Sequence, residues 1–329
     1  MLKVFGLGLM VVSSTLLMAC NPGVKFTLPS TSNNFDQNIS YNNKVDILWI
    51  MDNSESMQKH QQNLSAQIPA LVSKLNSLKM DYQMAVITTS MGGTVANGGQ
   101  FIGSPRIMTN STADLSSQLA SRLVVGENGS NLERGLYSME TVLSPTYLAN
   151  DGKGFLRSDA LLVVIALSNE DDQSRTPAAD DATYYTNFLD SVKAPWADGT
   201  RSWTFNFLGI LTDSGACATT GTDYKAPGYA FMSLADASNG TKASICSADL
   251  SVAVSGISAR VMQILTDFKL SSVPNLSTIV VKINGQVIPQ DATNGWQYIP
   301  DKNVIRFNGT AVPAADASIV VNFTPASAS

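Results

Sequence analysis

Apolar runs of strand length alternate with segments of helical periodicity along most of the chain, and this alternation constrains the fold more than any other feature. Near-continuous apolar runs occupy residues 45–51 and 160–167, as strands covered on both faces require, and further strands are expected at 82–88 and 203–211. Between and after them, helical spacing is found at 64–78, 112–124, 131–143, 179–193, 228–238 and 248–267, with a short weak strand at 243–246. The pattern predicts an α/β fold with an open, mostly parallel sheet and helices on both faces. In such sheets, ligands bind at the carboxyl ends of the strands.

The last part of the chain changes character and predicts a small all-β module over residues 269–329. Alternating runs at 279–283 and 286–289 flank Asn284-Gly285, a strong signal for a two-residue hairpin. Three more short strands are expected, at 296–299, 303–307 and 318–323. Such a module is a spacer, a partner-binding surface or a packing addition, and the sequence does not decide between them.

The first 19 residues are typical of an export signal. Lys3 precedes a largely apolar run that is shorter than the roughly 20 residues needed to span a membrane. The run ends in Leu17-Met18-Ala19-Cys20, which resembles the lipobox of bacterial lipoproteins. The resemblance implies lipid attachment at Cys20 and a place in the bacterial cell envelope, and Asn21 favours the outer membrane. The alternative is an ordinary signal peptide with an incidental cysteine.

Residues 20–44 are rich in Asn, Ser and Pro and predict a tether between the lipid and the fold. With Cys20 acylated, Cys217 and Cys246 remain as a pair. A disulfide is the expected state of such a pair in an oxidising envelope, and two free buried thiols are the alternative.

Composition excludes several function classes. The net charge is −5 and only 14% of residues are charged, so no basic nucleic-acid face is expected. The one histidine, His60, follows Ser56 by four residues on an expected helix, where an exposed or capping role is favoured over that of a general base. No G-x-S-x-G, Walker A or G-x-G-x-x-G motif stands in the required context. We therefore expect neither an enzyme nor a small-molecule substrate.

The motif that points to chemistry is Asp52-Asn53-Ser54-Glu55-Ser56, directly after the first apolar run. It resembles the metal-ion-dependent adhesion site (MIDAS) of von Willebrand factor A (vWA) domains, which have a Rossmann-like fold, and the resemblance covers residues 45–268. Alternate residues of the turn point inward, so two hydroxyls can bind a small hard cation directly while the carboxylate supplies charge, mostly through bound water. Such a site suits Mg²⁺, with Mn²⁺ or Ca²⁺ as relatives. Without the resemblance, the motif would be a turn in which Ser54 or Ser56 caps the next helix.

The family draws further ligands from two later loops. Ser130 is the hydroxyl that matches the family's threonine, and Asn169 stands at the position of its aspartate. This asparagine removes a negative charge, unless Glu170 or Asp171 replaces it. Glu133 is interpreted as a helix-start carboxylate favoured by the helix dipole, or else as a further acid of the site.

Together these features predict a membrane-anchored binding or adhesion module. Its cation would hold an Asp or Glu side chain of a protein partner, as the family's sites do. The alternative is an envelope scaffold or assembly factor that uses the fold without functional metal binding.

Overall fold

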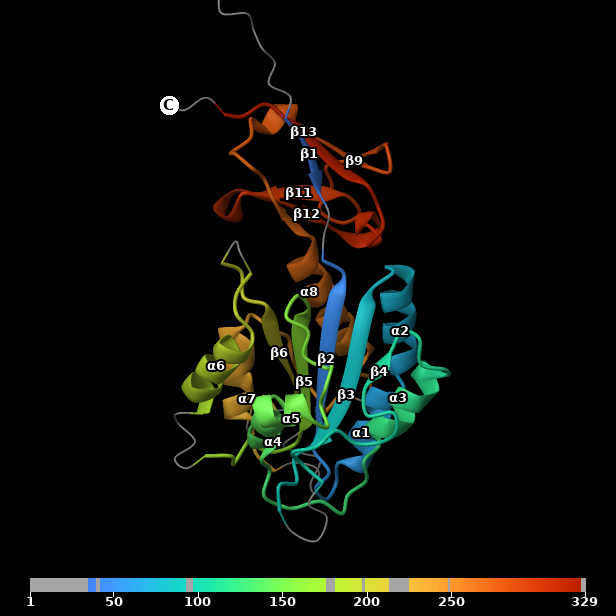
Figure 1. Cartoon of the computed structure of the whole chain (residues 1–329), viewed down its shortest axis with the longest axis vertical. Coiled ribbons are helices and arrows are strands. Elements are labelled where there is room, and N and C mark those ends of the chain that lie inside the picture. The colour runs from blue at the N-terminus through green and yellow to red at the C-terminus, as the bar shows by residue number, and fades with distance from the viewer. Residues whose placement is uncertain are drawn as a thin grey trace, which may run out of the picture.

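The computed structural model describes residues 35–39, 42–92, 97–175, 181–196, 199–212, 225–247 and 249–326, and it confirms the predicted α/β class. Six strands form one sheet in the order β4-β3-β2-β5-β6-β7 (Figure 1). All neighbouring strands are parallel except β3 and the short edge strand β4. The strands are β2 (Lys44–Met51), β3 (Asp81–Thr88), β4 (Met108–Thr109), β5 (Leu161–Ser168), β6 (Trp203–Gly209) and β7 (Lys242–Ser244).

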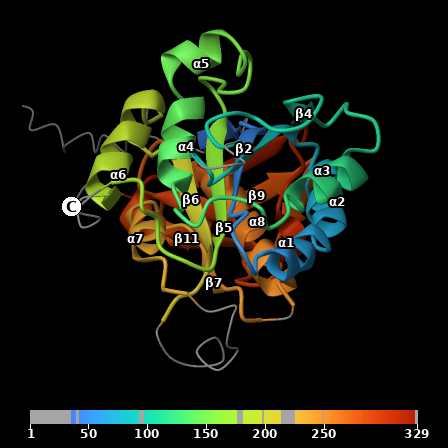
Figure 2. The same ribbon diagram turned by 90° about the horizontal axis from the view of Figure 1, so that it is seen from below.

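Helices cover both faces of the sheet (Figure 2). One face carries α1 (Gln58–Ser65), α2 (Ile68–Ser77), α3 (Leu115–Leu123) and α8 (Ser251–Thr266), and the other carries α4 (Gly135–Val142), the short α5 (Pro145–Ala149), α6 (Asp181–Val192) and α7 (Tyr229–Ala237). Successive residues of a strand point to opposite faces. In β2, Ile47 and Trp49 therefore enter one core while Leu48 and Ile50 enter the other. This is the reason for the continuous apolar run in the sequence.

The predicted helix over residues 64–78 is wrong in one respect, because the structure divides it. Helix α1 ends at Ser65 and α2 begins at Ile68, with Pro69 in its first turn. Proline is favoured there because the first N–H groups of a helix have no partner within it. The apolar spacing continues across the break, so periodicity alone did not reveal it.

The β module consists of two small antiparallel sheets around a core of its own. One sheet has the order β1-β13-β9-β10 and the other β11-β12-β8. Their strands are β1 (Phe35–Ile39), β8 (Asp267–Lys269), β9 (Val280–Ile283), β10 (Gln286–Ile288), β11 (Trp296–Ile299), β12 (Val304–Phe307) and β13 (Ile319–Phe323), and 3₁₀ turns occur at Leu276–Thr278, Pro300–Lys302 and Gly309–Ala311.

Strand β1 falls within residues 20–44, which the sequence predicted to be a tether. It pairs antiparallel with β13, from Phe35 opposite Phe323 to Ile39 opposite Ile319. Strand β8, at the predicted domain boundary, also joins the module by pairing with β12. The α/β domain thus lies in sequence between two parts of the β module.

The module contacts the α/β domain beside the point where the parallel strands begin. The backbone N–H of Ala315 donates to the carbonyl of Leu78 (3.0 Å), and Lys79 pairs with Asp316. Strands β2, β3 and β5 run away from the module (Figure 1). Their carboxyl ends therefore lie at the opposite end of the molecule.

The N-terminal predictions and one cysteine lie outside the described residues. These include the signal segment, Cys20 and Cys217, so lipid attachment and the Cys217–Cys246 disulfide stay predictions. Cys246 is half-buried against the core on the α8 side of the sheet. Within the described ranges, none of the helices combines the length and the apolar character that crossing a membrane requires.

Two glycine substitutions are expected to have opposite effects on stability. Gly285 has a φ of +81° in the β9–β10 turn, and a Cβ there would meet no atom within 4 Å. Gly285→Ala should therefore cost about 1 kcal/mol through backbone conformation alone. Gly256 lies inside α8, where a Cβ would make only an ordinary 3.6 Å contact with Thr241. Gly256→Ala should stabilise the chain by up to about 1 kcal/mol. Urea unfolding of both variants measures the change in the free energy of unfolding. A change in the same direction for both variants would contradict this expectation.

Candidate metal centre

The predicted motif forms a rigid turn at the carboxyl end of β2. Asp52 is buried, and its Oδ1 accepts a hydrogen bond from the backbone N–H of Ser54 (2.8 Å). Its Oδ2 accepts one from the hydroxyl of Ser168 at the end of β5 (2.7 Å). The carboxylate is therefore held in one orientation by both strands.

The two serines of the motif do not cap the following helix, so that interpretation is wrong. The N-cap residue of α1 is Met57, and no side chain caps it there. Ser54 is buried, and its Oγ has no hydrogen-bond partner. Ser56 has a φ of +74°, a strained conformation for a residue with a side chain. A buried hydroxyl with no partner and a strained neighbour are features that a structural turn does not need.

The turn lies where the strand order of the sheet reverses. Counted along the chain, the sheet has the order 3-2-1-4-5-6, and β2 and β5 are its first and fourth strands. In doubly wound sheets, ligands bind at this switch point. The backbone N–H of Asp52 donates to the carbonyl of Leu167 (3.0 Å), which ties the two strand ends together.

Asn169 meets the motif from β5. Its Nδ2 donates to the hydroxyl of Ser56 (2.9 Å), so the side chain faces the turn as the resemblance implies. In this arrangement the amide supplies a hydrogen-bond donor to the serine. It adds no negative charge to the site.

The glycine loop that contains Ser130 is fastened to the same turn. The backbone N–H of Gly129 donates to the carbonyl of Asn53 (2.7 Å), and that of Ser130 donates to the hydroxyl of Ser90 (2.7 Å). A Cβ at Gly129 would lie 2.4 Å from Asn53 Oδ1, so any larger residue would have to displace the buried side chains of Asn53 and Ser90. The Ser130 hydroxyl accepts a hydrogen bond from the backbone N–H of Leu132 (3.0 Å) and keeps a lone pair.

Gln61 connects the two loops, a role that the sequence alone did not indicate. This buried side chain of α1 donates from Nε2 to the carbonyls of Asp52 (2.8 Å) and Gly126 (2.9 Å). Its Oε1 accepts from the backbone N–H of Gly126 (3.1 Å). A glutamine on an apolar helix face was the one available signal. Nearby Glu127 accepts from the N–H of Gln58 (3.0 Å) and so holds the same loop to the start of α1.

Glu133 differs most from its interpretation as a helix-start carboxylate. Helix α4 begins two residues later, has no acidic residue in its first turn, and leaves Glu133 fully buried. Neither carboxyl oxygen makes a hydrogen bond of ordinary geometry. Burial and the adjacent charge of Asp52 raise the pKa of Glu133 to about 10, against a smaller opposing effect of Thr89. This buried acid beside Asp52 is a functional residue candidate.

The other acids after β5 have structural tasks or remain partly exposed. Asp171 accepts from the backbone N–H of Ala230 (2.8 Å) at the start of α7, and Asp172 accepts from that of Leu136 (3.0 Å) at the start of α4. Glu170 is half-buried, and burial followed by the charge of Asp52 raises its pKa while Lys225 lowers it.

The donor set fits a small hard cation. Asp52 and Glu133 are neighbouring buried carboxyls, no ion pair to either is found among the described residues, and Ser54 offers an unused hydroxyl. Oxygen donors of this kind suit Mg²⁺, Mn²⁺ or Ca²⁺. No group of three or more His, Cys, Asp or Glu side chains in the described part of the chain is arranged to hold a metal. A cation here would therefore depend on the serine hydroxyls as well as the acids.

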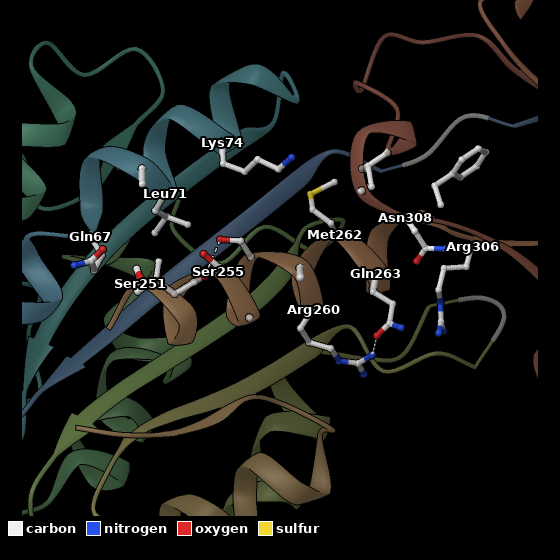
Figure 3. Close-up of a pocket in the computed structure, with 18 residues that line it drawn as sticks. Gln67, Leu71, Lys74, Ser251, Ser255, Arg260, Met262, Gln263, Arg306 and Asn308 are labelled. Atoms are coloured by element: carbon white, nitrogen blue, oxygen red, sulfur yellow. Dashed lines mark hydrogen bonds between the residues drawn. The ribbon is translucent and has the colours of Figure 1, made fainter. Parts of the chain in front are cut away.

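A separate cavity of about 640 Å³ lies between α2, α8 and β12 (Figure 3). It is lined by apolar side chains such as Leu71 and Met262 and by Arg260 and Arg306. None of the residues predicted for the metal site lines it.

His60, which we expected at the surface or at a cap, is buried within α1.

No protein-family model matches the chain, and no curated protein matches its sequence. Among solved structures, proximal thread matrix protein 1 from the mussel byssus is 13% identical, with a TM-score of 0.39 over 75% of this chain and 51% of that one. The pilus adhesin SpaC of Lactobacillus rhamnosus GG is 12% identical, with a TM-score of 0.48 over 88% and 39%. The ArnB paralog VWA2 of Sulfolobus acidocaldarius is 12% identical, with a TM-score of 0.36 over 88% and 59%.

This chain therefore spans between 39% and 59% of the length of these three structures. A further structure of the mussel protein, 13% identical with a TM-score of 0.33 over 62% of this chain and 48% of that one, has zinc in its MIDAS motif. The assignment of this chain to an open α/β sheet with a strand-end site rests on its own strand order and helix placement.

Proposed function

We propose that this chain is a protein-binding module in which a divalent cation, preferably Mg²⁺, holds an acidic side chain of a partner. The observation that carries the proposal is the buried Ser54 hydroxyl without a partner, beside an Asp52 carboxylate fixed by two hydrogen bonds at the switch point of the sheet. A rigid donor set with an unused oxygen is what a cation site needs before the cation arrives.

Asp52, Ser54 and Ser56 would hold the ion from the turn after β2, with Ser130 and Asn169 reaching it from the neighbouring loops. The bound cation would supply positive charge beside the buried carboxyls of Asp52 and Glu133. The described residues of the turn fix oxygen donors for such an ion. Recognition of a carboxylate, without bond cleavage, is the chemistry that this arrangement supports.

The same proposal places the module in a bacterial envelope. Lipid attachment at Cys20 would hold it at the outer membrane, and a Cys217–Cys246 disulfide would suit that oxidising compartment. The metal site lies at the end of the α/β domain that is remote from the β module, which contains β1, the first described strand. The described chain thus begins at the β module, at the end opposite the metal site.

Isothermal titration of residues 21–329, which retain every described residue, with MgCl₂ and MnCl₂ tests the proposal. Asp52→Ala should weaken cation binding by about 100-fold or more, because it removes the fixed carboxylate. Glu55→Ala is the matched control, since this exposed acid in the same turn should matter little. Equal binding by Asp52→Ala and wild type, or no binding by wild type, would contradict the metal account and favour the scaffold alternative.

A further inference from the structure

We infer that Glu133 supplies the negative charge that Asn169 does not bring to the site, as a carboxylate ligand of the cation. This inference rests on the proposed function and adds a residue that the motif does not contain. The second acid of the site would thus have moved from the loop after β5 to the loop before α4.

The position of Glu133 is set by backbone hydrogen bonds to both sides of the site. Its carbonyl accepts from the N–H of Gln173 (2.6 Å), in the loop after β5. The N–H of Arg134 donates to the carbonyl of Thr89 (3.1 Å), directly after β3. The side chain is therefore held between the ends of two strands that flank β2, beside Asp52.

The environment of Glu133 lacks what a buried acid ordinarily requires. Its side chain is fully buried, its oxygens have no ordinary hydrogen bond, and no ion pair to it exists among the described residues. A buried carboxyl in this state is costly, and such groups are usually paired or bound to a metal. A divalent cation held by Glu133 together with Asp52 would remove this penalty.

The other acids near the site do not meet these conditions. Asp171 and Asp172 are occupied as acceptors at the starts of α7 and α4. Glu170 is partly exposed and is influenced by Lys225. Glu133 alone among these acids is fully buried with unused oxygens. Glu133 and Asp52 together give the site two carboxylates. Asp52 and an aspartate at position 169 would give the same number.

A charge-exchange series tests the inference, using wild type, Glu133→Gln, Asn169→Asp and the double variant. Glu133→Gln should weaken Mg²⁺ binding by about 10-fold or more and abolish the rise in melting temperature that saturating Mg²⁺ produces. Adding Asn169→Asp should recover most of the affinity. Without metal, Glu133→Gln should melt at the same temperature as wild type or higher, because it removes a buried acid, whereas a purely structural role predicts a lower one.

Glu140→Gln on α4 is the matched control, because this acid accepts from the hydroxyl of Tyr184 (2.6 Å) and plays no part in the site. It should leave Mg²⁺ binding unchanged. Wild-type affinity in Glu133→Gln, or no recovery in the double variant, overturns the inference and leaves the proposed function in place. No binding by wild type overturns both. If Glu133→Gln fails to fold, the Mg²⁺ affinity of Asn169→Asp alone decides. We expect that affinity to change by less than about threefold, since the site already has two like charges. A gain in affinity above about 10-fold overturns the inference.

Discussion

Replacing Asp46 by alanine is expected to lower the free energy of unfolding by about 3–5 kcal/mol, because it removes the buried carboxylate that faces Arg157 and leaves the guanidinium with only the partly exposed carboxylate of Asp81. Asp46 is fully buried in β2, where its Oδ1 accepts from Arg157 Nε (2.8 Å) and its Oδ2 accepts from the Arg157 backbone N–H (2.7 Å). The Arg157 side chain is only 18% exposed. Urea unfolding measures the loss. A loss below about 1 kcal/mol would show that the ion pair contributes no more to stability than an exposed pair does.

Asp81→Ala is the matched control, because Asp81 also pairs with Arg157 (2.8 Å) but is 43% exposed. It should cost less than about 1 kcal/mol. Mg²⁺ binding should be unchanged in both variants, since the pair lies where β2 and β3 begin, at the other end from the metal site.

The effect of Asp46 should also depend on pH. Burial raises its pKa from 3.8 to about 6, although Arg157 acts in the opposite direction. Between these two values the folded state binds the proton more tightly than the unfolded state does. The stability that Asp46 contributes is therefore largest below pH 3.8 and is lost as the pH rises through about 6. The difference between wild type and Asp46→Ala should be larger at pH 4 than at pH 7.

Gln61→Leu should be the most damaging change near the site, because it removes three hydrogen bonds while keeping the side-chain volume. The carbonyls of Asp52 and Gly126 and the N–H of Gly126 would lose a partner. At about 1–3 kcal/mol for each unsatisfied buried group, with water reaching the partly buried Gly126, we expect a loss of about 3 kcal/mol. Chemical unfolding measures it.

The same variant should weaken Mg²⁺ binding by about 10-fold, because Gln61 holds the turn after β2 against the glycine loop. Gln62→Leu is the control, since its side chain is exposed on the same helix. Intact affinity in a destabilised Gln61→Leu protein would mean that the two loops do not need to be held together for the cation to bind.

Much of the α/β domain could be predicted because its strands are buried on both faces. The runs at 45–51 and 160–167 have no polar face, and few other structures require that pattern. The hairpin at Asn284-Gly285 was equally predictable, because both residues have positive φ in the turn and few other residue types tolerate it. Strand β1 was not, because its partner β13 lies at the far end of the chain and its five residues show no sustained period.

The site divides in the same way. Asp52, Ser54 and Ser56 follow one strand within five residues, so their convergence is a local property that the sequence by itself determines. The rigidity of the turn, the clamp made by Gln61 and the burial of Glu133 depend on loops that come together only when β2, β3 and β5 lie side by side. The burial and the charge environment of each side chain in this site depend on all of those loops together. Only the tertiary structure therefore decided which acids lie beside Asp52.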